Sequence, residues 1–362
     1  MSSTNTNANR FWSPNVHNLL PYVPGEQPKL SNLVKLNTNE NPFPPSSKVF
    51  AAMQGQLCDS LRLYPDPNAT ELCRSLAKRS GLAVNQVFVG NGSDEVLAHT
   101  FQALLQHSEP LLFPDISYSF YPVYCGLYGI DKREVPLAED LTINVNDYQG
   151  PNGGVILPNP NAPTGELLSL VAIRQLLTAN PNRVVVIDEA YIDFGGQSAT
   201  QLVPQFDNLL VVQTLSKSRS LAGLRVGFAF GQSHLIDALE RVKNSFNSYP
   251  LSSEAQAGAV AAIEDEHYFQ QTCQANIEQR EQLADQLKGL GFSMTQSHAN
   301  FLFVTHRSME AVAIASALRQ QGIIVRHLTN SPRITNYLRI SVGSASDCEL
   351  LVQALTELLT SS

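Results

Sequence analysis

The sequence predicts an α/β protein with two domains: a large domain with a mostly parallel central sheet covered by helices, and a smaller α+β domain. Between residues 86 and 230, short apolar runs rich in β-branched residues alternate with segments of helical length. Each run ends in polar or turn-forming residues. After about residue 247 the pattern changes, which indicates a second domain, as expected for a chain too long for one core.

The apolar runs in the first part are continuous, as in strands buried on both faces. They are residues 86–89, 155–157, 183–187 and 209–213. Residues 94–106 and 167–177 carry apolar side chains at helical spacing. Strands alternating with such helices predict a parallel sheet covered on both faces, where ligands bind beyond the carboxyl ends of the strands.

The second part begins with a long polar helical region, residues 266–290. Strands are expected at 300–304, 322–326 and 336–342, and helices at 308–321 and 347–360. We therefore expect an N-terminal arm at 1–34, a large domain at 35–248 and a small domain at 249–362. The Pro-rich stretch at 21–30 is expected to be extended and to lie on another surface.

Composition excludes several functional classes. The formal net charge is −8, which argues against a nucleic-acid partner or an anionic membrane surface. The five cysteines are widely spaced without a C-x-x-C pair, and the histidines lack metal-ligand spacing, so neither a disulfide framework nor a metal site is predicted. No membrane span or secretory signal is evident. We expect a cytoplasmic protein in a reducing compartment.

The turn "GNGSDE" at 90–95 follows a predicted strand and opens a predicted helix. Backbone N–H groups of Gly92, Ser93 and Asp94 would point at an anion, which the helix dipole also favours. The acidic side chains are then expected to point away. Plain turn chemistry with a serine cap is the alternative.

Two further polar residues follow apolar strands. Asp188 ends the run "VVVID", where a carboxylate is costly unless a cation meets it, although an aspartate capping the next loop has the same pattern. Lys217 stands between two serines after the strand at 209–213. A partly desolvated lysine can form a Schiff base with a carbonyl, whereas a solitary lysine is more often a solvated surface group.

The order of these motifs along the chain is more specific than any one of them. With them occur "LNTNENPFPPS" at 36–46, "YPDP" at 64–67, "PNAPTG" at 160–165, "DEAYIDF" at 188–194, "TLSKSRSLAGLRVGF" at 214–228 and "LRISVG" at 338–343. Together they resemble the fold-type-I enzymes that depend on pyridoxal 5′-phosphate. Within that superfamily the chain is similar to the histidinol-phosphate aminotransferases over nearly its whole length.

The resemblance implies a role for each matching residue. Lys217 would bond to the cofactor aldehyde and act as the catalytic base. Ser216 and Arg225 would hold the cofactor phosphate, and the backbone at Gly92 and Ser93 would complete that phosphate site.

The remaining cofactor contacts follow in the same way. Asp94 would orient the turn with its side chain, and Tyr118 would stack on the pyridine ring. Asp188 would keep the ring nitrogen protonated, and Tyr191 would donate to the ring hydroxyl oxygen. Tyr64 would reach the phosphate in the neighbouring subunit, so the resemblance implies a homodimer with shared active sites.

One position departs from the superfamily pattern. The residue before "PTG" is usually an asparagine that also bonds the ring oxygen, but here it is Ala162. Asn161 stands one residue upstream and is expected to supply the amide instead, although a one-residue shift changes the direction of the side chain.

The implied reaction interconverts L-histidinol phosphate and 2-oxoglutarate with imidazole-acetol phosphate and L-glutamate. Arg326 and Arg339 would bind the substrate anion, since guanidinium groups bind carboxylates and phosphates in a planar, bidentate manner. Tyr22 of the arm would close the pocket; a surface position for Arg326 is the alternative. An aromatic-amino-acid aminotransferase and a threonine-phosphate decarboxylase-like lyase would use the same cofactor set. A non-catalytic cofactor-sensing module would need a DNA-reading extension, and none is seen.

Overall fold

The larger of two sheets has seven strands within the part of the chain that the computed structural model describes, residues 9–28 and 33–360. Its strand order is β2-β8-β7-β6-β5-β3-β4, and β8 alone runs antiparallel to its neighbours β2 and β7. The strands are β2 Val87–Asn91, β3 Leu111–Pro114, β4 Lys132–Val135, β5 Gly154–Pro158, β6 Val185–Asp188, β7 Leu209–Thr214 and β8 Val226–Gly231. The predicted mostly parallel sheet is confirmed.

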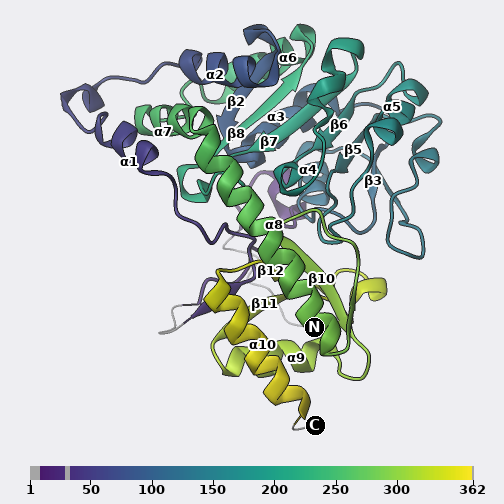
Figure 1. Ribbon diagram of the computed structural model, residues 1–362. Helices are drawn as coiled ribbons and strands as arrows, with labels where there is room; N and C mark the ends of the chain where they lie inside the picture. The colour runs from purple at the N-terminus through teal and green to yellow at the C-terminus, as the bar shows by residue number, and fades with distance from the viewer. Residues whose placement is uncertain (1–8, 29–32, 361–362) are drawn as a thin grey trace.

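Helices cover both faces of this sheet (Figure 1). Alternate strand residues enter opposite apolar clusters: Val185 and Ile187 lie in one, and Val186 lies in the other. Helices α2, α5 and α7 pack on the first face, and α3, α4 and α6 pack on the second. The helices are α1 Ser47–Gln54, α2 Thr70–Ser80, α3 Gly92–Leu104, α4 Tyr121–Tyr128, α5 Leu170–Ala179, α6 Ser233–Phe246 and α7 Ser253–Glu264.

A second, mainly antiparallel sheet has the order β1-β11-β12-β10-β9 among the described residues. Its strands are β1 Val34–Leu36, β9 Phe292–Met294, β10 Phe301–His306, β11 Ile323–His327 and β12 Leu338–Ser341. Helices α9 Ala311–Gln320 and α10 Ala345–Thr360 cover it, and the long α8 Glu266–Gly289 runs from the large part to the small part (Figure 1).

The division expected at residues 34/35 and 248/249 does not coincide with this packing. Strand β1 pairs in parallel with β11, so residues 34–36 belong to the small sheet. Helix α7 buries Ala255, Ala259 and Ile263 in the core of the large part. The local sequence predicts neither the pairing of β1 with β11 nor the packing of α7 on the large part, because each depends on contacts between residues far apart in the chain.

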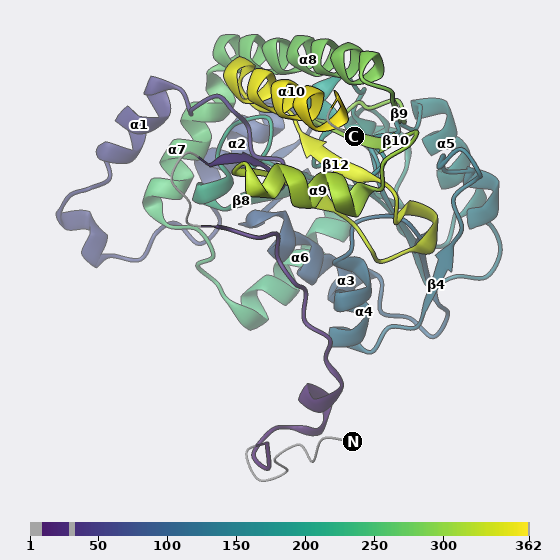
Figure 2. The same cartoon turned by 90° about the horizontal axis from the view of Figure 1, so that it is seen from below.

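The described part of the expected arm, residues 9–28, leads away from the body of the molecule (Figure 2). Its apolar side chains Phe11, Leu20 and Val23 are at least three-quarters exposed. Tyr22 packs on Phe120, with ring centroids 4.8 Å apart. Residues 1–8 and 29–32 of the expected arm lie outside the described residues.

The cysteines are free thiols, four of them buried. None of the helices in the described ranges combines the length and apolar character that a membrane crossing requires.

Candidate active site

A cavity of about 130 Å³ opens at the carboxyl edge of the large sheet. Most residues predicted to bind the cofactor line it, although they come from five separate segments of the chain. These are Ser93, Asp94, Tyr118, Asp188, Tyr191, Ser216, Lys217 and Arg225. The parallel strands β5, β6 and β7 end together at this edge, which explains why segments distant in sequence meet here.

Asp188, the last residue of β6, forms the most enclosed part of the cavity and is 5% exposed. Its Oδ2 accepts a hydrogen bond from the Tyr121 hydroxyl at 2.8 Å, but its Oδ1 is buried with no hydrogen-bond partner in the structure. Burial raises the pKa of Asp188 to about 6. A buried oxygen without a donor, facing a cavity, fits a cationic N–H group of a ligand.

The N-terminus of α3 forms another wall, where Gly92 begins the helix with φ +76°. A Cβ at this position would lie 2.4 Å from Nη2 of Arg225. Glycine is therefore required both by the backbone conformation and by the close approach of the guanidinium. Helix N–H groups beside an arginine favour an anion.

Asp94 differs from the expectation that the acidic side chains of this turn point away. It lines the cavity: its Oδ1 accepts from the Tyr118 hydroxyl at 3.0 Å and its Oδ2 accepts from Arg225 Nη2 at 2.7 Å. The carboxylate can face the cavity because these two donors stabilise its charge. Asp94 thereby orients the Tyr118 ring and the Arg225 guanidinium on either side of it.

Lys217 lies just after β7, and its Nζ donates to the backbone oxygen of Thr38 at 3.1 Å. Its own backbone oxygen accepts from Asn41 Nδ2 at 3.0 Å. The amine stands 5.8 Å from the centre of the Tyr191 ring. Lys217 is thus a half-buried cavity residue, and the solvated-surface alternative is wrong.

Ser216 supports the same end of the cavity. Its hydroxyl oxygen lies 2.9 Å from Thr214 Oγ1, which in turn lies 3.2 Å from Val226 O. Ser216 lines the cavity, and its contact with a phosphate stays a prediction.

The structure does not bring Asn161 into the cavity. Ala162 lines it, whereas Asn161 is fully buried with its Nδ2 donating to Ile116 O and Thr164 Oγ1, each at 3.0 Å. The expected substitution of Asn161 for the missing asparagine is therefore not supported, because the Asn161 amide is bound to Ile116 and Thr164 inside the protein.

Sequence reasoning also missed contacts. It assigned no role to Tyr121, which bonds Asp188, or to Asn39, whose Nδ2 donates to the Tyr191 hydroxyl at 3.0 Å. The signal for Asn39 was its place in the motif at 36–46, and that for Tyr121 was its position one helical turn after Tyr118.

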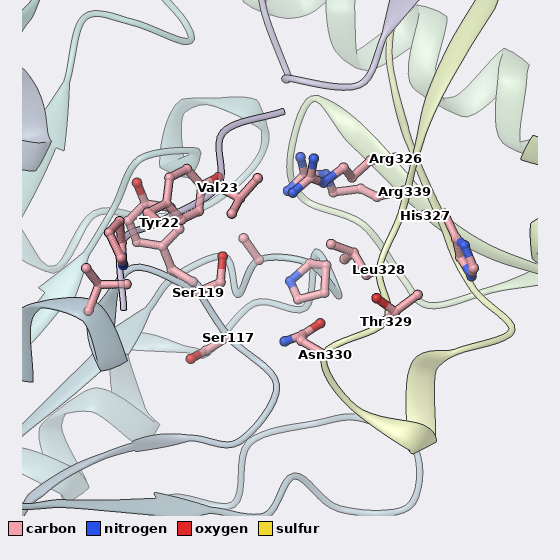
Figure 3. A pocket seen from close by; sticks show the side chains of 15 residues that line it. Tyr22, Val23, Ser117, Ser119, Arg326, His327, Leu328, Thr329, Asn330 and Arg339 are labelled. Atoms are coloured by element: carbon pink, nitrogen blue, oxygen red, sulfur yellow. The ribbon is translucent and has the colours of Figure 1, made fainter. Parts of the chain in front are cut away.

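A second cavity, of about 320 Å³, shares Tyr118 and Ala162 with the first and holds the residues predicted to bind substrate. Arg326 on β11 and Arg339 on β12 are direct neighbours in the antiparallel register. Their guanidinium groups lie side by side, and Tyr22 stands on the opposite wall (Figure 3). Arg326 is therefore a partly buried cavity residue, and the alternative of a surface position is wrong.

Arg339 is held firmly in this place. Its Nη2 donates to Asn37 O at 3.1 Å, its guanidinium lies 5.5 Å from the centre of the Phe301 ring, and its Nε has no partner in the structure. Burial lowers the pKa of Arg339, and the neighbouring positive charge of Arg326 acts in the same direction. Two cations without an acidic partner in this cavity fit an anionic group of a substrate.

Tyr64 lies outside both cavities. It is 82% exposed and stacks on Tyr249, with ring centroids 4.6 Å apart. Within one chain it therefore contacts no predicted cofactor residue, and its predicted role requires a second copy.

Comparison with known proteins agrees with the geometry. The model of the family "Aminotransferase class I and II" matches residues 31–355, so the chain belongs to this class of enzymes, which depend in general on pyridoxal phosphate.

Within that class, the chain is a member of the histidinol-phosphate aminotransferase family. It is 60% identical over 353 residues to histidinol-phosphate aminotransferase 2 of Dechloromonas aromatica, covering 96% of this chain and 99% of that protein. It is 61% identical over 346 residues to histidinol-phosphate aminotransferase 1 of Pseudomonas aeruginosa, with 96% and 98% covered.

Solved structures share the fold. The histidinol-phosphate aminotransferase of Clostridium acetobutylicum superposes with a TM-score of 0.84 at 19% identity, covering 91% of this chain and 100% of that one. That of Sinorhizobium meliloti, in complex with pyridoxal 5′-phosphate, gives 0.81 at 22% identity, with 90% and 91% covered.

Proposed function

We propose that this aminotransferase converts L-histidinol phosphate and 2-oxoglutarate to imidazole-acetol phosphate and L-glutamate, in either direction, as a step of histidine biosynthesis. The observation that carries the proposal is that the Lys217 amine and the unpaired Asp188 carboxylate oxygen line one cavity. The choice of substrate rests on the names of relatives about 60% identical over 96% of the chain.

The residues present fit pyridoxal 5′-phosphate as the cofactor. Asp188 Oδ1 would accept from the protonated ring nitrogen, and Ser216, Arg225 and the N–H groups at the start of α3 would hold the phosphate. When bound, the cofactor supplies an electron-withdrawing ring that stabilises negative charge on the substrate α-carbon.

Protein groups then carry out the proton chemistry. Lys217 would hold the cofactor through its Nζ, and the free Nζ would act as the base that takes the proton from the substrate α-carbon. Thr38 O, 3.1 Å from Nζ, orients the amine. Tyr118, fixed by its hydrogen bond to Asp94, would stack on the pyridine ring of the cofactor. The Tyr191 hydroxyl would donate to the hydroxyl oxygen of that ring.

Arg326 and Arg339 would bind the end of the substrate that lies farthest from the reacting carbon. Histidinol phosphate presents a phosphate, and glutamate presents carboxylates, so one cationic site must accept both anions. Arg326 and Arg339 provide two planar, charged donors for this purpose, and Tyr22 would cover the bound substrate.

A homodimer with shared sites completes the proposal. An exposed aromatic pair, Tyr64 and Tyr249, together with exposed Leu57, Leu61 and Leu63, provides an apolar surface suited to a second copy of this chain. The free cysteines support a reducing compartment, which for this enzyme would be the cytoplasm.

The test is the visible absorbance of the purified protein with pyridoxal phosphate, before and after L-histidinol phosphate, beside Lys217→Ala. We expect a pH-dependent band that histidinol phosphate discharges and that the variant lacks. Phenylalanine and threonine phosphate serve as competing substrates. Discharge by phenylalanine alone would make this an aromatic-amino-acid aminotransferase, and absence of any Lys217-dependent band would refute the cofactor assignment.

A further inference from the structure

The segment 37–41 forms hydrogen bonds with residues that line each of the two cavities. Asn37 O accepts from Arg339, Thr38 O accepts from Lys217, and Asn41 Nδ2 donates to the Lys217 backbone oxygen. Asn39 stands in the middle of this segment and is 1% exposed. Its backbone has φ +57°, a left-handed conformation that asparagine tolerates better than most residues.

The hydrogen bonds of Asn39 fix which way its amide points. The Ser341 hydroxyl accepts from the Asn39 backbone N–H and donates to Asn39 Oδ1, both at 2.9 Å. With Oδ1 held by Ser341, Nδ2 is directed at the Tyr191 hydroxyl oxygen, 3.0 Å away. Asn300 Nδ2 donates to the Asn39 backbone oxygen at 3.0 Å, so both ends of the residue are anchored.

This contact determines what the Tyr191 hydroxyl can do. A phenol oxygen carries one hydrogen and accepts at its lone pairs. The Tyr191 hydroxyl oxygen accepts from Asn39 Nδ2, and this NH2 group cannot accept a hydrogen bond. The hydroxyl hydrogen of Tyr191 must therefore point away from Asn39. Tyr191 lines the cavity that holds Lys217, so the hydrogen is available to a ligand there.

We propose that Asn39 is a positioning residue for Tyr191: its amide directs the hydroxyl hydrogen into the cofactor cavity, where the side chain of Ala162 offers no donor. The proposal rests on the proposed function, in which Tyr191 donates to the cofactor ring oxygen. Asn39 acts through Tyr191 and does not itself line the cavity.

The same bonds connect the two cavities. Ser341 ends β12 two residues after Arg339, so the strand that carries the substrate arginine also anchors the Asn39 amide. Docking of the small sheet against the large part therefore sets the orientation of the Tyr191 hydroxyl.

The test is the pH midpoint of the visible band of the cofactor-loaded enzyme. Donation to the ring oxygen weakens its hold on the neighbouring proton, so losing that donation raises the midpoint. Asn39→Gly removes the amide and keeps the left-handed backbone. We expect it to raise the midpoint by about half to one pH unit, the equivalent of one net hydrogen bond.

A double-mutant cycle distinguishes an effect of Asn39 on the Tyr191 hydroxyl from a general disturbance of the site structure. In the Tyr191→Phe background, Asn39→Gly should add no further shift, because the hydroxyl on which Asn39 acts is gone. Asn152→Gly is the matched control for Asn39→Gly: Asn152 is a similarly buried asparagine, and its Nδ2 donates to Gly150 O and Asn180 Oδ1, which lie outside both cavities. This variant should leave the midpoint unchanged.

Asn39→Asp is the second variant, because it keeps the left-handed backbone and the bond to Ser341. Its midpoint shift should be smaller with Tyr191→Phe than without it, even if Asn39→Gly fails to fold. A wild-type midpoint in Asn39→Gly, or a shift of equal size in both backgrounds for either variant, overturns the proposal while the proposed function stands. Absence of a Lys217-dependent band in the wild type overturns both.

Discussion

At the scale of single residues, the buried carboxylate of Asp188 in the cofactor cavity lowers the free energy of unfolding of the cofactor-free protein. The carboxylate is buried, and burial raises its pKa to about 6 from the ordinary 3.8. The folded cofactor-free chain therefore binds a proton more tightly than the unfolded chain does. Stability is lost as the pH rises from about 4 through 6, and the full loss remains above that range.

Asp188→Asn should therefore stabilise the cofactor-free protein at pH 8, by on the order of 2 kcal/mol, and much less at pH 4. Urea unfolding at both pH values measures the difference. Asp237→Asn, at an exposed position, is the control and should give the same small effect at both. A uniform effect of Asp188→Asn would show that its burial is not the cause. The same variant should bind pyridoxal phosphate more weakly.

Arg326→Ala should raise the KM for histidinol phosphate about 10- to 100-fold, the loss expected for one charged hydrogen-bonding partner. Steady-state kinetics measure it, and Arg319→Ala is the control because Arg319 is exposed, pairs with Glu26 and lines neither cavity. An unchanged KM for Arg326→Ala would remove this residue from the substrate site.

At the scale of elements, the N-terminus of α3 is the part of the site with the least freedom to vary. Strand β8 runs beside it, and a Cβ at Gly227 would lie 2.2 Å from the Ser93 backbone nitrogen. Gly92 is restricted by its left-handed backbone, with φ +76°, and by the close approach of the Arg225 guanidinium. The helix start, the strand and the arginine therefore fit together only without side chains at these two positions.

Gly92→Ala should weaken pyridoxal phosphate binding at least 10-fold, because the new methyl group displaces Arg225 and the backbone is strained at φ +76°. An absorbance titration gives the dissociation constant. Gly126→Ala in α4 has open space around the added carbon and should bind normally. Wild-type affinity in Gly92→Ala would contradict the phosphate assignment.

The strands of the large sheet and many residues of the site could be predicted from the sequence, because their patterns are local. Residues 184–187 are all apolar and lead directly to Asp188, so both the strand and the end that carries the acid are evident locally. The role of β1 was not evident, because three residues give too short a pattern and its partner β11 lies almost 300 residues away. Asn39 and Tyr121 were missed because their partners are known only once the strands are assembled.

At the scale of the whole molecule, the role proposed for the exposed Tyr64 predicts that each active site needs two chains. Mixing Lys217→Ala with Tyr64→Ala chains tests this idea. Each variant alone should have little activity, whereas a hybrid dimer would contain one site with both defects and one intact site. Activity should therefore appear on mixing under exchange conditions. No recovery, despite exchange shown by native mass spectrometry, would contradict shared sites.

Strand β1 has a consequence for motion. Because it belongs to the small sheet while α1 belongs to the large part, the chain crosses between the two parts along residues 37–46 and again along α8. We expect these two crossings to restrict how the small part can move relative to the large part. The first crossing contains the segment that touches Lys217 and Tyr191, so a shift of the small part should be transmitted directly to these two residues.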